Sequence, residues 1–309
     1  MTKRAWIGSI ALALAGVALA EAALRQRHRW SARQQRPLGL RPQSQEADEE
    51  RRSWDLRVVA LGDSNTYGPG LPYEATFPAL LEARLRSLGR SARVWNAGIN
   101  GQTVLQGLER LERDVMQRQP NLVLVAFGLN DCNLRRWPAD DERERRLFPH
   151  GLGGWLGQLH LARTVTWRTR RLFRKVRRAQ QGEGNLVPRE EPRVHPLYFR
   201  LGLIRLVKEV RRRTGARVCL LTTSPVRRGA RSDLPPLQQA RQWETYWRYN
   251  ALIRLAAWEC GAALVDLEHS LAGSLEEDGL EADGVHLTAE GHARVADAIW
   301  QVWQELGLV

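Results

Sequence analysis

From Trp54 onward, short apolar segments alternate with amphipathic ones, and this alternation limits the possible fold more than any other feature of the chain. The apolar segments with the character of strands are 57–61 (RVVAL), 92–98, 121–128, 216–225 and 263–267. Helical periodicity is found in 76–89, 103–118, 198–215, about 237–260 and the stretch from Thr288 onward. Continuous apolar strands that alternate with helices are typical of a parallel sheet covered on both faces. The sequence therefore predicts an α/β fold.

The first 24 residues have the composition of a membrane anchor or a signal segment. Two basic residues precede an apolar run from Ala5 to Leu24, whose length fits a secretory signal or a short membrane-spanning helix. The small residues at 18–20 (ALA) offer a cleavage site, whereas the apolar pattern that continues to Leu24 fits an uncleaved anchor. We expect a hydrophobic helix ahead of the domain, with cleavage left open.

Residues 25–53 form a polar linker, because they are rich in Arg, Gln, Pro and Glu and poor in apolar residues. The domain then runs from 54 to 309, interrupted by an insertion at about 132–196 that lacks a strand pattern. Within it, residues 159–178 predict a basic amphipathic helix. Such a helix packs on the domain with a solvated face, or it serves as a lid or rests on a membrane surface.

The chain is strongly basic, with 47 Lys and Arg against 34 Asp and Glu and a net charge of +13. This charge favours anionic partners such as lipid head groups or acidic glycans. We expect no nucleic acid, because no recognised nucleic-acid motif is present. The three cysteines, Cys132, Cys219 and Cys260, have no metal-like spacing and suggest no disulfide framework; we expect Cys219 and Cys260 to be buried thiols. We expect no metal and no cofactor.

Four short segments place polar groups at or just after strand ends. Ser64 lies in GDS, Gly101 in NAGINGQT, Asn130 in FGLND, and Asp283 and His286 in DGVHLT. Because the carboxyl ends of parallel strands open on one edge of a sheet, these segments can share a cleft. Taken singly, each has an ordinary structural explanation, such as a turn or a helix cap.

Together the four segments offer a coherent chemistry. A serine hydroxyl becomes a nucleophile when a base takes its proton, and His286 can be that base for Ser64. Asp283 can accept the hydrogen bond of the other ring nitrogen and stabilise the imidazolium ion. An oxyanion needs preorganised donors, and the candidates are the backbone N–H groups of Ser64 and Gly101 and the side-chain amide of Asn130.

The same segments carry a family resemblance. GDSNTYG, NAGINGQT, GLND and DGVHLTAEGH resemble the four sequence blocks of the SGNH (GDSL-type) hydrolases, from about Arg57 to the carboxyl terminus apart from the insertion. The resemblance implies a flavodoxin-like three-layer α/β/α sandwich and acyl cleavage or transfer without a metal. It places the nucleophile on Ser64, the oxyanion donors on Gly101 and Asn130, and the Asp–His pair on Asp283 and His286. The long basic insertion departs from the family pattern.

We therefore expect a serine esterase that hydrolyses an acyl ester of a lipid or an O-acylated glycan through a Ser64 acyl-enzyme. An O-acyltransferase with the same residues is the nearest alternative, because both enzymes share the first half-reaction. A catalytically inactive binding module is a third possibility, against which the intact Ser64, Asp283 and His286 argue.

The location of the domain relative to the membrane is a separate expectation. Five arginines between residues 25 and 36 favour a cytoplasmic domain if the apolar segment stays as an anchor. The charged start, the ALA site and the anchored bacterial relatives that the chain resembles favour export. We expect a membrane-anchored protein with a periplasmic or extracellular domain, in contact with the membrane through the N-terminal helix and also through the basic insertion.

Overall fold

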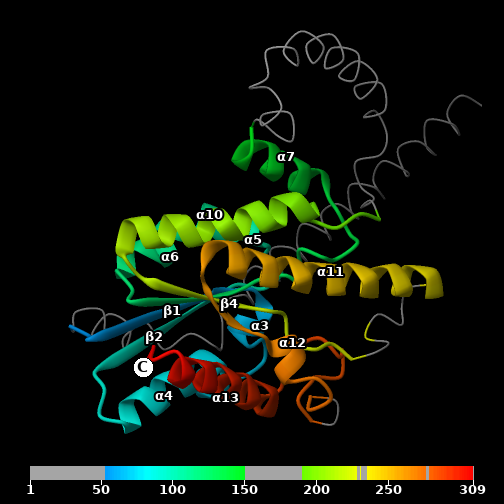
Figure 1. The fold of residues 1–309 in the computed structure, drawn as a ribbon. Coiled ribbons are helices and arrows are strands. Elements are labelled where there is room, and N and C mark those ends of the chain that lie inside the picture. The colour runs from blue at the N-terminus through cyan, green and yellow to red at the C-terminus, as the bar shows by residue number, and fades with distance from the viewer. Residues whose placement is uncertain (1–52, 150–189, 228–229, 231–234, 276–277, 309) are drawn as a thin grey trace, which may run out of the picture.

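The computed structural model of the protein describes residues 53–149, 190–227, 230, 235–275 and 278–308 (Figure 1). The expected anchor at 1–24, nearly all of the linker at 25–53 and the basic helix at 159–178 lie outside these ranges. Every helix within the described ranges is too short or too polar to cross a membrane.

Five parallel strands form one sheet in the order β2-β1-β3-β4-β5. The strands are β1 (Leu56–Gly62), β2 (Ala92–Gly98), β3 (Leu122–Ala126), β4 (Arg217–Leu221) and β5 (Ala263–Val265). Their mostly apolar sequences suit a sheet that is covered on both faces. The predicted fold class, a parallel sheet in a three-layer α/β/α sandwich, is confirmed.

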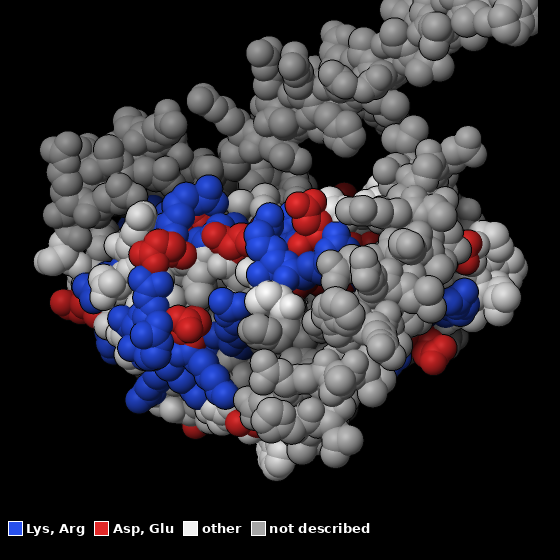
Figure 2. Space-filling model, turned by 90° about the horizontal axis from the view of Figure 1, so that it is seen from above, with Lys and Arg blue, Asp and Glu red and all other residues white. Residues whose placement is uncertain are grey.

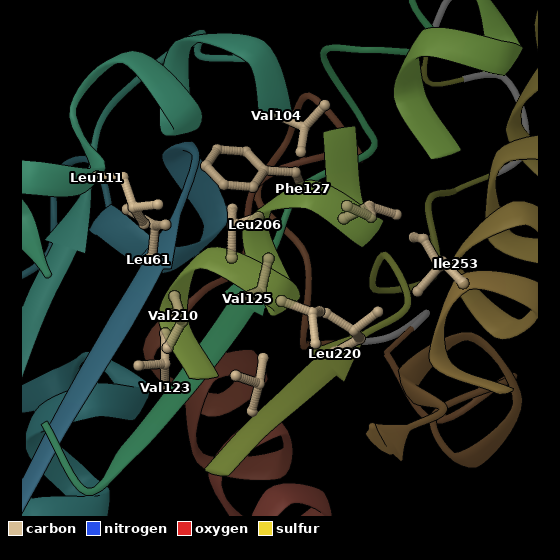
Figure 3. Close-up of a cluster of buried hydrophobic side chains, with 14 of the residues drawn as sticks. Leu61, Val104, Leu111, Val123, Val125, Phe127, Leu206, Val210, Leu220 and Ile253 are labelled. Atoms are coloured by element: carbon tan, nitrogen blue, oxygen red, sulfur yellow. The ribbon is translucent and has the colours of Figure 1, made fainter. Parts of the chain in front are cut away.

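Helices cover the two faces of the sheet. In Figure 1, α5 (Val104–Glu109), α6 (Leu111–Asp114), α10 (Pro196–Thr214) and α11 (Pro236–Cys260) lie above it, whereas α4 (Phe77–Ser87), α12 (Leu267–Ser270) and α13 (Ala289–Glu305) lie below. Alternate strand residues point to opposite faces, so Val59 and Leu61 enter one apolar cluster while Val58 and Ala60 enter the other. Figure 3 shows the first cluster, in which Val123, Val125 and Phe127 pack against side chains of α10.

Two predicted details differ from the structure. The segment 103–118 was expected as one helix, but it consists of α5, α6 and the short helix η2 (Met116–Arg118). Arg110 interrupts it, because its guanidinium donates hydrogen bonds to the carbonyl oxygens of Gly62 (2.8 Å) and Ala97 (2.7 Å) at the ends of β1 and β2. Cys219 is buried as expected, whereas Cys260 is only partly buried; all three cysteines are free thiols.

The described ends of the insertion are bonded to each other and to the segment that follows β3. Helix α7 (Pro138–Leu147) follows β3, and Arg136 just before it is buried among Asp141, Glu144 and the carbonyl oxygen of Pro192. On the return path, the amide of Val194 donates a hydrogen bond to the carbonyl oxygen of Asp131 (3.2 Å). The insertion therefore leaves and re-enters the domain beside the carboxyl end of β3.

Candidate active site

Ser64 sits on a tight turn at the carboxyl end of β1. It is the first residue of the four-residue helix α3 (Ser64–Tyr67), which Asp63 caps by accepting a hydrogen bond from the amide of Asn65 (3.0 Å). A β-carbon at Gly62 would lie 2.7 Å from the carbonyl oxygen of Ala126 in β3, so only glycine fits there.

The structure brings the predicted serine, histidine and aspartate into one hydrogen-bonded chain. Ser64 Oγ lies 3.1 Å from His286 Nε2, and His286 Nδ1 lies 2.5 Å from Asp283 Oδ2. These contacts fit a neutral imidazole that carries its proton on Nδ1, donates it to the carboxylate and accepts the serine O–H at Nε2. Such an arrangement can remove the serine proton.

Asp283 is held as a carboxylate by the loop that carries it. Its Oδ1 accepts hydrogen bonds from the amides of Val285 (2.8 Å) and His286 (2.9 Å), while Oδ2 faces the ring. Partial burial acts to raise the pKa of Asp283, but these hydrogen bonds outweigh it and hold the pKa below its usual value. The group is therefore suited to stabilise a protonated His286.

Asn130 lies beside the serine and is oriented by Asp63. Its Nδ2 donates a hydrogen bond to Asp63 Oδ2 (3.2 Å), and the residue lines the same cavity as Ser64 and His286. Complete burial raises the pKa of Asp63 to about 6, although hydrogen bonds from Asn65 and Asn130 act to lower it. The sequence identified Asn130 but not Asp63 as the residue that orients it.

Gly101, another predicted oxyanion donor, occupies a different position. It is exposed, adopts the left-handed conformation with φ of 72° and is not on the wall of the cavity that Ser64 and Asn130 share. Its carbonyl oxygen accepts a hydrogen bond from the guanidinium of Arg193 (2.8 Å), a residue of the insertion. The role of the Gly101 amide as an oxyanion donor stays a prediction.

A cavity of about 320 Å³ opens at Ser64 and His286. Helix α11 forms one wall through Gln239, Gln242, Trp243 and Tyr246. Leu129, Val226 and Val285 add apolar surface, and Asn133 and Arg227 add polar groups. Mixed apolar and polar walls of this kind are typical of small-molecule sites. The sequence indicated the hydroxyl, imidazole and amide groups but not the α11 wall.

Asn65 links the elements of the site and was not identified as a functional residue from the sequence. Its Nδ2 donates hydrogen bonds to Ser224 Oγ (3.1 Å) and to the carbonyl oxygen of Val285 (3.2 Å). The three residues come from the serine turn, the segment after β4 and the histidine loop. Only the position of Asn65 next to Ser64 could have suggested this role.

His292, which also lies in the DGVHLTAEGH block, has a structural environment. It is fully buried, stacks on Phe77 and accepts a hydrogen bond at Nδ1 from the Phe77 amide (3.1 Å). Burial lowers the pKa of His292 to about 4. Within the described ranges, no group of three His, Cys, Asp or Glu side chains is placed to hold a metal ion.

The chain matches a known protein family. Residues 60–294 match the GDSL-like lipase/acylhydrolase family. This match covers most of the chain, and the protein belongs to that family.

The chain aligns with only part of each curated relative that it matches. An arylesterase of Vibrio mimicus is 39% identical over 82 residues, which are 26% of this chain and 40% of the relative. The thioesterase 1/protease 1/lysophospholipase L1 of Escherichia coli K12 is 42% identical over 74 residues, 24% of this chain and 34% of the relative. The chain thus aligns with well under half the length of these relatives.

Solved structures share the fold over a longer span. A lipase/acylhydrolase from Enterococcus faecalis matches with a TM-score of 0.53 and 19% identity, covering 81% of this chain and 96% of that one. An acetylxylan esterase from Geobacillus stearothermophilus matches with a TM-score of 0.52 and 18% identity, covering 81% and 94%. At this identity the likeness establishes the fold.

Proposed function

We propose that the protein hydrolyses an acyl ester through a covalent Ser64 intermediate. The observation that carries this proposal is the hydrogen-bonded chain from Ser64 through His286 to Asp283, open to a cavity. Family membership supports the same reaction class, and the arylesterase and acetylxylan esterase among the similar proteins act on esters by name.

In the first half-reaction, Ser64 Oγ attacks the ester carbonyl carbon as His286 Nε2 takes the hydroxyl proton. The imidazolium that forms is stabilised by the Asp283 carboxylate. The tetrahedral oxyanion is stabilised by the Ser64 amide and the Asn130 side-chain amide, with the Gly101 amide as a third predicted donor. Collapse breaks the ester C–O bond, and His286 passes its proton to the departing alkoxide.

In the second half-reaction, water attacks the acyl-enzyme and gives up a proton to His286. The second tetrahedral intermediate expels Ser64 Oγ, which recovers the proton from the imidazolium. The products are a carboxylic acid and a free enzyme. An O-acyltransferase would use the same residues, with an alcohol in place of water.

The cavity supports a substrate with a small acyl or aryl group. A space of about 320 Å³ lies at the lower end of the range for small-molecule sites. Trp243 and Tyr246 provide apolar contact, whereas Gln239 and Asn133 provide hydrogen-bonding groups. We infer that the substrate is an ester of a lipid or an O-acylated glycan whose reacting end fits this space.

We further propose that the protein is tethered to a membrane through residues 1–24 and a linker at 25–53, with the 54–309 domain in the periplasm or outside the cell. The apolar composition of the leader and its basic start support the tether. A carboxyl-terminal alkaline phosphatase fusion tests the location, because the phosphatase is active only when it is exported.

The central test uses the full-length protein in detergent with an aryl acetate as substrate. Wild type should release the phenol, and Ser64→Ala should abolish the reaction while the melting temperature stays close to that of wild type. A fluorophosphonate should label Ser64 and no other serine. Labelling elsewhere, or full activity of Ser64→Ala, contradicts the proposed nucleophile. Product analysis with an added alcohol distinguishes hydrolysis from transfer.

A further inference from the structure

The outer face of α11 carries a row of exposed apolar side chains. Trp247 is 55% exposed, Leu255 39% and Trp258 79%. With Ala251 between them, these residues recur at intervals of four, four and three, which places them on one side of the helix. The opposite side, with Tyr249, Ile253 and Ala256, is buried in the core. We call the exposed row, residues 247, 251, 255 and 258, the tryptophan stripe.

Helix α10 lies beside α11 on the same face of the sheet and is strongly basic (Figure 1). It contains six Lys and Arg residues and a single acidic residue, Glu209. Arg205, Lys208, Arg212 and Arg213 are exposed. Seen from above this layer, Lys and Arg side chains form a patch with a few acidic groups among them (Figure 2).

The basic helix and the tryptophan stripe are fastened together. The Arg211 guanidinium donates hydrogen bonds to the carbonyl oxygens of Cys260 and Gly261, the latter at 2.8 Å, at the end of α11. Arg200 of α10 also pairs with Glu259 of α11. The residues of α11 that make these contacts, Glu259 and Cys260, directly follow Trp258, the last member of the stripe.

The stripe is also continuous with the wall of the cavity. Trp243 and Tyr246 line the cavity, with ring centroids 5.6 Å apart. Tyr246 in turn contacts the ring of Trp247 at 5.7 Å. One helix thus connects the candidate active site to the exposed tryptophans.

We propose that the outer face of α10 and α11 docks on an anionic lipid bilayer. Tryptophan is enriched at membrane–water interfaces, where its ring and N–H match the mixed environment. Exposed arginines and lysines are attracted to anionic head groups. The aliphatic Leu255 within the stripe fits acyl chains better than the polar surface of a glycan or a nucleic acid. Docking would bring the cavity close to esters in the bilayer, and only this consequence rests on the proposed esterase function.

A photocrosslinking experiment identifies what covers the stripe. The full-length protein, with p-benzoylphenylalanine in place of Trp258, is reconstituted in phosphatidylcholine vesicles with and without phosphatidylglycerol and then irradiated. We expect lipid adducts that increase with phosphatidylglycerol. The matched control carries the same probe at Leu88, an exposed residue at the end of α4 on the opposite face of the sheet, and should give few adducts. Crosslinks from position 258 to another segment of the chain, to a second copy or to added polysaccharide overturn the proposal.

Kinetics provide a second readout that separates docking from chemistry. The double variant Trp247→Ser/Trp258→Ser should lose about tenfold in kcat/KM for a long-chain ester carried in anionic vesicles, with kcat for a water-soluble ester unchanged. Lys208→Ser/Arg212→Ser should weaken the dependence on phosphatidylglycerol and on salt. Leu88→Ser/Leu306→Ser, exposed on the opposite layer, is the control. Equal losses on both esters overturn the docking proposal, whereas an inactive wild type contradicts the proposed function and leaves the crosslinking result to decide docking.

Discussion

Asn65 joins the serine turn to the histidine loop, because its side-chain Nδ2 donates a hydrogen bond to the carbonyl oxygen of Val285 at 3.2 Å. Asn65 directly follows Ser64, and Val285 directly precedes His286. The bond therefore connects the neighbours of the two residues whose side chains meet at 3.1 Å. A second hydrogen bond from the same amide to Ser224 Oγ, at 3.1 Å, connects both to the segment that follows β4.

Replacing Asn65 should loosen the alignment of Ser64 and His286. Small errors in the placement of reacting groups are costly, so Asn65→Ala should lower kcat by about 10- to 100-fold with a smaller change in KM. Asn65→Asp keeps the shape but removes the N–H donor and should show a similar loss. Steady-state kinetics with an aryl acetate measure both.

A control separates alignment from general stability. Asn121 Oδ1 accepts a hydrogen bond from the amide of Arg57 (2.7 Å) at the amino ends of β1 and β3, away from the site. Asn121→Ala should lower the melting temperature without lowering kcat. Equal kcat in Asn65→Ala and wild type would show that the bond to Val285 has no part in alignment.

Asn130 should contribute through the transition state. Loss of one oxyanion donor typically costs about 10²- to 10³-fold in kcat, and we expect Asn130→Ala to fall in this range with little change in KM. Asn130→Asp should be at least as impaired, because a second carboxylate would then face Asp63. An unchanged kcat in Asn130→Ala would leave Asn130 as a turn residue.

Asp283 should act by fixing the His286 tautomer. Asp283→Asn keeps the size of the side chain but can present an N–H to Nδ1, which favours the wrong tautomer and can cost about 10⁴-fold in kcat. The rate of fluorophosphonate labelling at Ser64 should fall in parallel. His292→Gln is the comparison, since His292 is buried against Phe77. The His292→Gln variant should mainly have a lower melting temperature. If it lost as much kcat as His286→Ala, the assignment of His286 as the base would be contradicted.

The α11 wall should limit the size of the substrate. Trp243 lines the cavity and contacts Tyr246 edge to face, so Trp243→Ala should enlarge the space and favour longer acyl groups. A few methylene groups in an apolar pocket can change selectivity by about tenfold or more. The ratio of kcat/KM for aryl octanoate to that for aryl acetate should rise by about this factor. A ratio equal to that of wild type would show that the acyl group does not bind beside Trp243.

The sequence predicted the sheet and the central groups of the site for a common physical reason. Continuous apolar strands imply burial on both faces, and the carboxyl ends of parallel strands meet at one edge. Ser64, Asn130 and His286 could therefore be assigned to one cleft although they are far apart in the chain. The prediction needed no knowledge of side-chain contacts.

What the sequence did not predict depends on contacts between distant side chains. The break in 103–118 follows from the Arg110 guanidinium, which binds carbonyl groups of two strands. The bond from Asn65 to Val285 spans 220 residues, and no local pattern indicates it. The cavity wall depends on how far α11 extends past the sheet. Helical periodicity predicts which side of a helix is buried, but it does not predict the position of the helix relative to the sheet.

The buried carboxyl group of Asp131 gives a pH-dependent prediction. Asp131 is fully buried between Asn130 and Cys132, and its Oδ1 accepts a hydrogen bond from the amide of Val104 (2.9 Å). Burial raises the pKa of Asp131 from 3.8 to about 8, with the Val104 amide and Arg193 acting in the opposite direction. Between these two pH values the folded chain holds a proton that the unfolded chain has released. Stability therefore falls as the pH rises from about 4 to about 8, because the unfolded state binds fewer protons there.

Asp131→Asn cannot ionise but still offers an oxygen to the Val104 amide, so it should lose this part of the pH dependence. A difference of one pH unit in pKa corresponds to about 1.4 kcal/mol, and 1 kcal/mol shifts the melting temperature of a domain of this size by about 2–4 °C. The melting temperature of Asp131→Asn relative to wild type should therefore rise by at least about 3 °C between pH 6 and pH 8.5. Asp114→Asn is the control, because hydrogen bonds from Arg113 and Arg110 outweigh burial and hold the pKa of Asp114 below its usual value, outside this window. The difference in melting temperature between Asp131→Asn and wild type could instead be the same at both pH values. That result would show that Asp131 is already ionised in the folded protein at pH 6.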